Sequence, residues 1–339
     1  MNEYNQKSVD FIAGMSRSGT TLLLSILNAN NQTLCIPEIP IALYGYSKYK
    51  YKENFTKDDA SIWLQLKSKI NPIRQIGVDE TLLKTSIENA KKYNEYLLSV
   101  YASIEFPDKK NAQEWTKIID KDHIHTFQTQ LLNTIFPKAK YILLVRNPLA
   151  FVNSCIEHAD NKNQTQTAVY YAAVWKAYAS DILKLISSDG KEKYLLVSYE
   201  DLVSTPEKTL KAICSHLDLE FTLEMLNVSN SKFNSLQENQ ALTTEQIERK
   251  NNKFSALQQS INSNRIQSWE GKFSQEEQDA IINSTKELAL KLNYILPTIQ
   301  NSKVQKSAFI EWKVKLYFKF AKRFYFLPIW LREKYKVKL

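Results

Sequence analysis

A glycine-bearing segment near the N-terminus, Gly14–Thr21 (GMSRSGTT), is a candidate phosphate-binding loop. Its two glycines allow the backbone to curl around an anion, and successive N–H groups at a helix start can bind that anion. The spacing is that of the nucleotide pattern G-x-x-x-x-G-K-[ST], except that Thr20 occupies the lysine position. Because that lysine contacts β- and γ-phosphates, the loop favours a single phosphate-type group, with Arg17 adding charge. The alternative is a turn that binds no ligand.

A second candidate anion site combines Arg146 with Ser154. Arg146 ends the apolar segment Lys140–Val145 (KYILLV), and Ser154 follows eight residues later on an expected helix. The carboxyl ends of strands in open α/β sheets line the ligand crevice. A guanidinium and a hydroxyl placed there suit a second phosphate. The alternative is a salt bridge at the helix start.

Together the two motifs resemble the family of sulfotransferases that use 3′-phosphoadenosine 5′-phosphosulfate (PAPS). The resemblance covers roughly residues 9–40 and 115–290, and implies that Arg146 and Ser154 bind the 3′-phosphate. It also implies that Tyr199, in Ser198–Leu202 (SYEDL), lies near the adenine, and that Arg265, in Arg265–Trp269 (RIQSW), belongs to a cofactor-covering segment. The residues implied to bind the 5′-phosphosulfate are Ser16, Arg17, Ser18, Gly19, Thr20 and Thr21.

Two further residues match the tyrosylprotein sulfotransferase branch and related bacterial members. Glu38 follows the loop at the spacing of that branch's catalytic glutamate, which implies a general base. Lys121 stands at the position of its lysine, which implies stabilisation of the leaving oxygen. The branch also has a serine two positions before the tryptophan, where this sequence has Gln267. The alternatives are a loop glutamate and a solvated lysine.

Histidines offer another base. Cytosolic small-molecule members use a histidine, but no Lys-x-His arrangement precedes the Arg146 strand. His123 and His125 follow Lys121 closely, so either is an alternative base. Their offset of two residues separates them on a helix, and no other pattern has metal-ligand spacing, so we expect no metal.

The order of apolar segments predicts an α/β fold: a P-loop-type central parallel sheet flanked by helices, with helical insertions. Strands are expected at Val9–Ala13, Trp115–Ile119, Lys140–Val145 and Tyr194–Ser198. Helices are expected at Thr20–Leu27, Ile124–Phe136, from Pro148, at Thr165–Ile186, from an N-cap at Thr205 to Leu217, and at Gln275–Leu292. Residues 44–110 should form helices that cap the site and touch the acceptor, and Ser229–Asn264 a polar insertion.

Composition indicates which compartment and which partners to expect. Three cysteines at long spacings argue against disulfides and favour a reducing cytoplasm. The polar N-terminus predicts no secretory signal, and no run of about 18 apolar residues predicts a spanning helix. Eleven Lys/Arg against two Glu in residues 302–339 account for the net charge of +9, so no nucleic-acid partner is expected. Oligomeric state is left open.

We therefore divide the chain into a sulfotransferase domain, residues 1–300, and a basic aromatic tail, residues 301–339. In the tail, aromatic and basic residues alternate, which suits either a peripheral membrane segment or a helix packed on the domain. The sequence favours transfer of a sulfuryl group to a carbohydrate or lipid-linked glycan hydroxyl. A peptide tyrosine is the second acceptor, and a P-loop nucleotide kinase is a more distant alternative.

Overall fold

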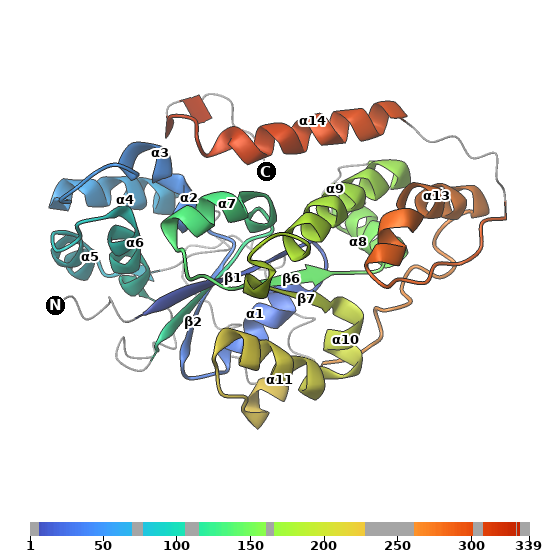
Figure 1. The fold of residues 1–339 in the computed structure, drawn as a ribbon, viewed down its shortest axis with the longest axis horizontal. Coiled ribbons are helices and arrows are strands. Elements are labelled where there is room, and N and C mark those ends of the chain that lie inside the picture. The colour runs from blue at the N-terminus through green and yellow to red at the C-terminus, as the bar shows by residue number, and fades with distance from the viewer. Residues whose placement is uncertain are drawn as a thin grey trace.

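A parallel sheet forms the centre of the molecule (Figure 1). The computed structural model describes residues 7–69, 77–105, 115–160, 166–227, 261–300, 308–329 and 331–332. Within them the strands run in the order β2-β5-β1-β6-β7, and every neighbouring pair is parallel. Their bounds are β1 Ser8–Gly14, β2 Thr33–Pro37, β5 Lys117–Lys121, β6 Tyr141–Val145 and β7 Tyr194–Ser198.

Both faces of this sheet are covered by helices, which explains why its strands are apolar throughout. Side chains alternate between the faces of a strand, so Ile142 and Leu144 of β6 join one core cluster, while Leu143 and Val145 join the other. The first cluster includes α1 (Thr20–Asn28), α10 (Tyr199–Ser204) and α11 (Pro206–Leu217). The second includes α7 (His125–Ile135), α8 (Pro148–Asp160), α9 (Ala168–Ile186), α13 (Gln275–Lys291) and α14 (Ala308–Phe324).

A helical region follows β2 and packs on itself through aromatic rings. Tyr49, Phe55, Tyr93 and Tyr96 form a cluster of stacked and edge-on rings. The Tyr93 hydroxyl donates to the carbonyl of Ala42, which ties the region's first helix to its last. Its elements are α2 Ile41–Tyr44, α3 Tyr46–Tyr49, η2 Lys57–Asp59, α4 Ala60–Lys69, β3 Gly77–Val78, α5 Glu80–Ile87, α6 Tyr93–Ala102 and β4 Ile104–Glu105. The expected helices are therefore present, and their contact with an acceptor stays a prediction.

The predicted fold class is confirmed, with corrections to individual elements. Strand β2 was not predicted, and β5 lies two residues later than Trp115–Ile119, which makes Lys121 its last residue. Thr205 stands at the N-cap of α11, but its side chain donates back to Asp201 and makes no cap hydrogen bond. Most of the insertion expected at Ser229–Asn264 lies outside the described residues. The domain boundary near residue 300 stays a prediction.

Candidate active site

The loop Gly14–Thr21 lies where the direction of the chain's crossovers reverses. From β1 the chain passes to β2 and β5 on one side, and then to β6 and β7 on the other. In open α/β sheets, ligands bind outside the carboxyl ends of the strands at such a switch point. Arg146, which follows β6, and Glu38, which follows β2, leave the sheet at this same edge. The topology therefore gathers the predicted site residues at one edge.

The loop needs glycine at its two ends. Gly14 has φ 104°, and a Cβ built on it would lie 2.2 Å from the carbonyl oxygen of Leu144. Gly19 has φ 84°, and a Cβ there would lie 2.7 Å from the Tyr199 ring. Side chains larger than hydrogen would displace backbone at the first position and an aromatic ring at the second. The two glycines thus let the loop lie directly against β6 and against the Tyr199 ring.

Thr126, at the start of α7, holds the loop from beneath. Its hydroxyl accepts from the Gly14 N–H at 2.7 Å and donates to the Gly14 carbonyl at 2.9 Å. The Ser18 and Thr20 side chains are buried, and the Ser16 side chain lies near the Tyr178 hydroxyl of α9. The N–H groups of Gly14 and Met15 are thus used within the protein, so an anion would be bound by the later N–H groups of the loop, at the start of α1.

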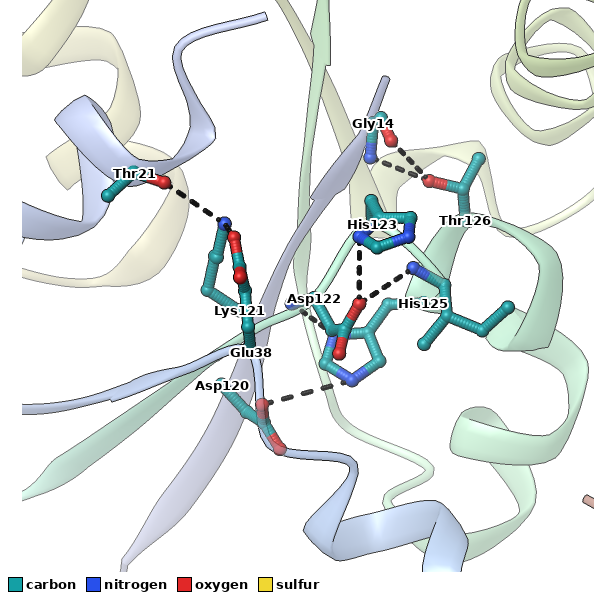
Figure 2. A network of polar contacts seen from close by, with 10 residues as sticks. Gly14, Thr21, Glu38, Asp120, Lys121, Asp122, His123, His125 and Thr126 are labelled. Atoms are coloured by element: carbon teal, nitrogen blue, oxygen red, sulfur yellow. Dashed lines mark hydrogen bonds and ion pairs between the residues drawn. The ribbon is translucent and has the colours of Figure 1, made fainter. Parts of the chain in front are cut away.

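Glu38 and Lys121 form an ion pair beside the loop (Figure 2). Pro37 pairs with Lys121 in the register of β2 on β5, so the next residue, Glu38, begins where β5 ends. Lys121 Nζ lies 2.5 Å from Glu38 Oε1 and 3.2 Å from the Thr21 hydroxyl. Its side chain is 3% exposed and that of Glu38 is 17% exposed. One cation thus connects a partly accessible carboxylate to the phosphate loop.

The backbone of Glu38 adopts an unusual conformation. Its φ is 41°, in the left-handed region that residues with a side chain seldom occupy. The Glu38 N–H donates to the Lys121 carbonyl at 2.6 Å, which extends the β2–β5 ladder by one bond. Local strain of this kind is common where a side chain must be aimed at a functional site.

Arg146 is held by a network of contacts. It donates from Nη1 to the Arg17 carbonyl at 3.0 Å and from Nη2 to the Arg265 carbonyl at 2.7 Å. Its guanidinium lies 4.4 Å from the centre of the Tyr199 ring. Trp175 of α9 donates its indole N–H to the Arg146 carbonyl at 2.9 Å.

The charge of Arg146 is costly without an anion. The side chain is buried, and its Nε–H has no hydrogen-bond partner among the described residues. Burial lowers the pKa of this guanidinium, although an arginine remains charged. A buried cation with an unused donor is the arrangement expected of a phosphate-binding arginine.

The remaining predicted residues complete this end of the site. Ser154 lies on α8, where its hydroxyl accepts from Arg17 Nε at 3.3 Å. Tyr199 begins α10 and packs between Arg146 and Gly19. Residues 261–269 cross the site: Asn153 donates to the Ser268 carbonyl at 3.1 Å, and the Arg265 side chain is exposed nearby. Gln267 occupies the position where the tyrosylprotein branch has a serine, and its side chain is exposed.

Of the two histidines proposed as alternative bases, His125 lies in the core, whereas a role for His123 stays a prediction. His125 is fully buried on the side of β5 opposite Lys121, edge-on to Phe11, and burial lowers its pKa to about 4. Its Nδ1 accepts from the Asp122 N–H at 3.2 Å, so the ring is a neutral core residue. His123 is partly exposed and its Nδ1 lies 3.1 Å from Asp122 Oδ1. Glu38, not a histidine, contacts Lys121 beside the loop.

Several residues that support the site were not found from the sequence. Thr126 and Trp175 donate hydrogen bonds to the carbonyls of Gly14 and Arg146 from helices that are distant in sequence. No sequence motif places either residue beside the loop or Arg146. Glu200 accepts from the Asn147 N–H and from the Tyr294 hydroxyl, which fixes the turn after Arg146. For Glu200, the one signal in the sequence was its position directly after Tyr199, a predicted site residue. No group of three potential metal ligands occurs within the described residues.

Comparison with known protein families agrees with the geometry of this site. The model of a family described as "Sulfotransferase family" matches residues 11–223, a span that contains the loop, Glu38, Lys121, Arg146, Ser154 and Tyr199. The chain belongs to the sulfotransferase family. The resemblance drawn from its motifs is therefore confirmed.

Relatives with known names agree with this assignment. "Protein-tyrosine sulfotransferase A" of Caenorhabditis elegans is 25% identical over 66% of this chain and 53% of its own. "Protein-tyrosine sulfotransferase" of Drosophila melanogaster is 24% identical over 64% of this chain and 39% of its own. The chain thus spans about half, or less, of the length of these relatives.

Solved structures share the fold. The sulfotransferase domain of the Synechococcus PCC 7002 olefin synthase superposes with a TM-score of 0.54 at 20% identity, covering 88% of this chain and 99% of that domain. The sulfotransferase domain from the curacin biosynthetic pathway superposes with a TM-score of 0.53 at 18% identity, covering 86% and 99%. The sheet and its flanking helices are therefore those of a sulfotransferase domain.

Proposed function

We propose that this protein transfers the sulfuryl group of PAPS to the phenolic hydroxyl of tyrosine in a protein or peptide. The observation that carries the proposal is the Glu38–Lys121 ion pair, which connects a partly accessible carboxylate to the phosphate loop through Thr21. The sequence favoured a carbohydrate acceptor, but relatives named protein-tyrosine sulfotransferases favour the second acceptor. A nucleotide kinase loses support from the family match.

The donor has groups that the site can bind at both ends. The loop N–H groups and Arg17 would hold the 5′-phosphosulfate, since a helix N-terminus attracts anions. The buried guanidinium of Arg146, with its unused Nε–H, and the Ser154 hydroxyl would hold the 3′-phosphate. Tyr199, packed on Arg146, offers a ring near the nucleoside.

The chemistry would then proceed as a single displacement. The acceptor oxygen bonds to sulfur while the bond between sulfur and the 5′-phosphate oxygen breaks, which releases adenosine 3′,5′-bisphosphate. The Glu38 carboxylate accepts the acceptor proton. Lys121 and the loop N–H groups stabilise the charge that develops on the leaving oxygen. The ion pair orients both catalytic groups before the donor reacts.

Transfer assays with the purified chain test the proposal. PAPS labelled in its sulfur would be offered with a tyrosine peptide, the same peptide with phenylalanine, and a neutral oligosaccharide. Label on the tyrosine peptide alone is the expected result. Label on the oligosaccharide alone would restore the carbohydrate acceptor. Competition binding should also show adenosine 3′,5′-bisphosphate binding more tightly than ATP, and the reverse order would favour a kinase.

A further inference from the structure

Helix α14 crosses the outside of the molecule above α7 and α9 (Figure 1). Its inner face is packed: Val314, Ala321 and Phe324 are buried, and Phe318 contacts the rings of Phe127 and Tyr178. The Gln128 side chain donates to the carbonyl of Ala321 at 2.9 Å. The alternative of a helix packed on the domain is therefore correct for this face.

The opposite face of α14 is also apolar, and it is exposed. Phe309, Trp312, Leu316 and Phe320 are 62%, 57%, 52% and 41% exposed. Their spacing of three, four and four residues places them in one stripe along the helix. At 1.5 Å per residue this stripe extends about 16 Å. The contacts of the inner face explain why the helix packs on the domain, but they do not explain why the outer face is apolar.

Charge around the stripe has one sign. Exposed cations flank the four apolar residues: Lys313, Lys315, Lys319 and Arg323. The acidic residue of the helix, Glu311, instead binds Lys176 of α9 at 2.8 Å and Ser284 at 3.2 Å. Lys322 pairs with Asp181 of α9 at 2.5 Å. The inner side thus satisfies its ion pairs, and the outer side keeps an excess of positive charge.

We propose that the outer stripe of α14 binds the surface of an anionic lipid bilayer. Aromatic and aliphatic side chains at headgroup depth, flanked by lysines, suit such a surface, and each basic residue near it adds on the order of 1 kcal/mol. A second copy of this chain is a poorer partner, because a two-fold contact through the stripe would place its cations against their equivalents. No described helix is long and apolar enough to cross a membrane.

Point variants separate this surface from the fold. Truncating α14 would uncover the apolar surface of α7 and α9, so the outer residues alone are changed. The full chain would be sedimented with vesicles of phosphatidylcholine, with and without about one third phosphatidylserine. Wild type should bind the anionic vesicles, and W312S/L316S should lose at least tenfold in partitioning. K315Q/K319Q should lose tenfold or more at low salt.

The matched control is Leu290→Ser on α13, because Leu290 is 71% exposed but lies outside the stripe. It should bind vesicles as wild type does, and all variants should keep the thermal midpoint and the affinity for adenosine 3′,5′-bisphosphate. Equal vesicle binding by wild type and W312S/L316S would overturn the proposal. So would a dimer, seen by light scattering, that W312S/L316S converts to monomer. Since the stripe lies away from the loop, either result leaves the proposed transfer reaction intact.

Discussion

Strand β5 has a buried lysine at each end, and each lysine pairs with a carboxylate from a neighbouring segment. At the amino end, Lys117 Nζ lies 2.6 Å from Asp10 Oδ2, and both side chains are less than 10% exposed. The other Asp10 oxygen accepts from the Lys140 N–H at 2.7 Å, so the carboxylate connects β1 to β5 and to the residue before β6. At the carboxyl end, the Lys121–Glu38 pair is as short but leaves the carboxylate partly accessible.

The comparison shows that position in the sheet, not residue type, separates the two pairs. The carboxyl ends of parallel strands open on the ligand crevice, whereas at the amino end of β5, here called the closed end, both side chains of the pair are buried. A lysine–carboxylate pair at the closed end can only hold strands together. The pair at the carboxyl end lies next to the phosphate loop, where the proposed reaction needs a group that accepts a proton.

The largest effect should come from Glu38→Gln. Glutamine keeps an oxygen for Lys121 but does not accept a proton, so kcat should fall about a thousandfold. Donor affinity should stay within about threefold, as isothermal titration with adenosine 3′,5′-bisphosphate would measure. Turnover within tenfold of wild type would mean that Glu38 is not the base and that the two pairs do not differ in function.

Asp10→Asn should act on stability instead. It leaves the buried Lys117 without a counter-charge, which should lower the free energy of unfolding by about 3 kcal/mol. Turnover per folded molecule should remain within twofold. Urea denaturation of both variants is the measurement, with Glu38→Gln as the matched change at the open end. A stability loss for Glu38→Gln as large as that for Asp10→Asn would make both pairs structural.

Arg146→Lys extends the comparison to the other anion site. Lysine keeps the charge but loses the fork that reaches the Arg17 and Arg265 carbonyls and the unused Nε–H. Affinity for adenosine 3′,5′-bisphosphate should fall about 30-fold, or about 2 kcal/mol. The affinity for adenosine 5′-monophosphate, which lacks the 3′-phosphate, should fall much less in the same variant. An equal loss for both nucleotides would mean that Arg146 acts through the loop rather than on the 3′-phosphate.

The smallest effect concerns His125, which lies near the open end of β5 but faces the core. Burial lowers its folded pKa to about 4, below the unfolded value of 6.5, so the unfolded chain takes up the extra proton. Stability from this group is therefore present above pH 6.5 and is lost as the pH falls toward 4, by about 1 kcal/mol between pH 7 and pH 5.5.

Comparison with His125→Gln isolates this term. Burial raises the pKa of neighbouring Asp120, which acts in the opposite direction, but Asp120 is present in both proteins. The difference in unfolding free energy between wild type and variant should therefore shrink by about 1 kcal/mol over this range. A constant difference would mean that His125 has the same pKa in the folded and the unfolded chain.

The sequence alone predicted the elements that carry the proposed donor site. The loop at Gly14–Thr21 is contiguous, and its strand and helix follow from local apolar patterns. Arg146 and Ser154 are eight residues apart on a strand end and the next helix, so their placement also needs only local structure. Long helices such as α9 and α13 were predicted for the same reason: their periodicity is repeated over many residues.

Tertiary structure alone decided the rest. Strand β2 is five residues long and ends in Pro37, which suits an edge strand but gives a weak local signal. Only its pairing with β5 brings Glu38 to Lys121, across 83 residues of sequence. The same is true of His125, which burial removes from the site, and of α14, whose two apolar faces differ only in what packs against them. Sequence spacing fixes contacts along an element, whereas contacts between elements depend on register and burial, which only the folded chain sets.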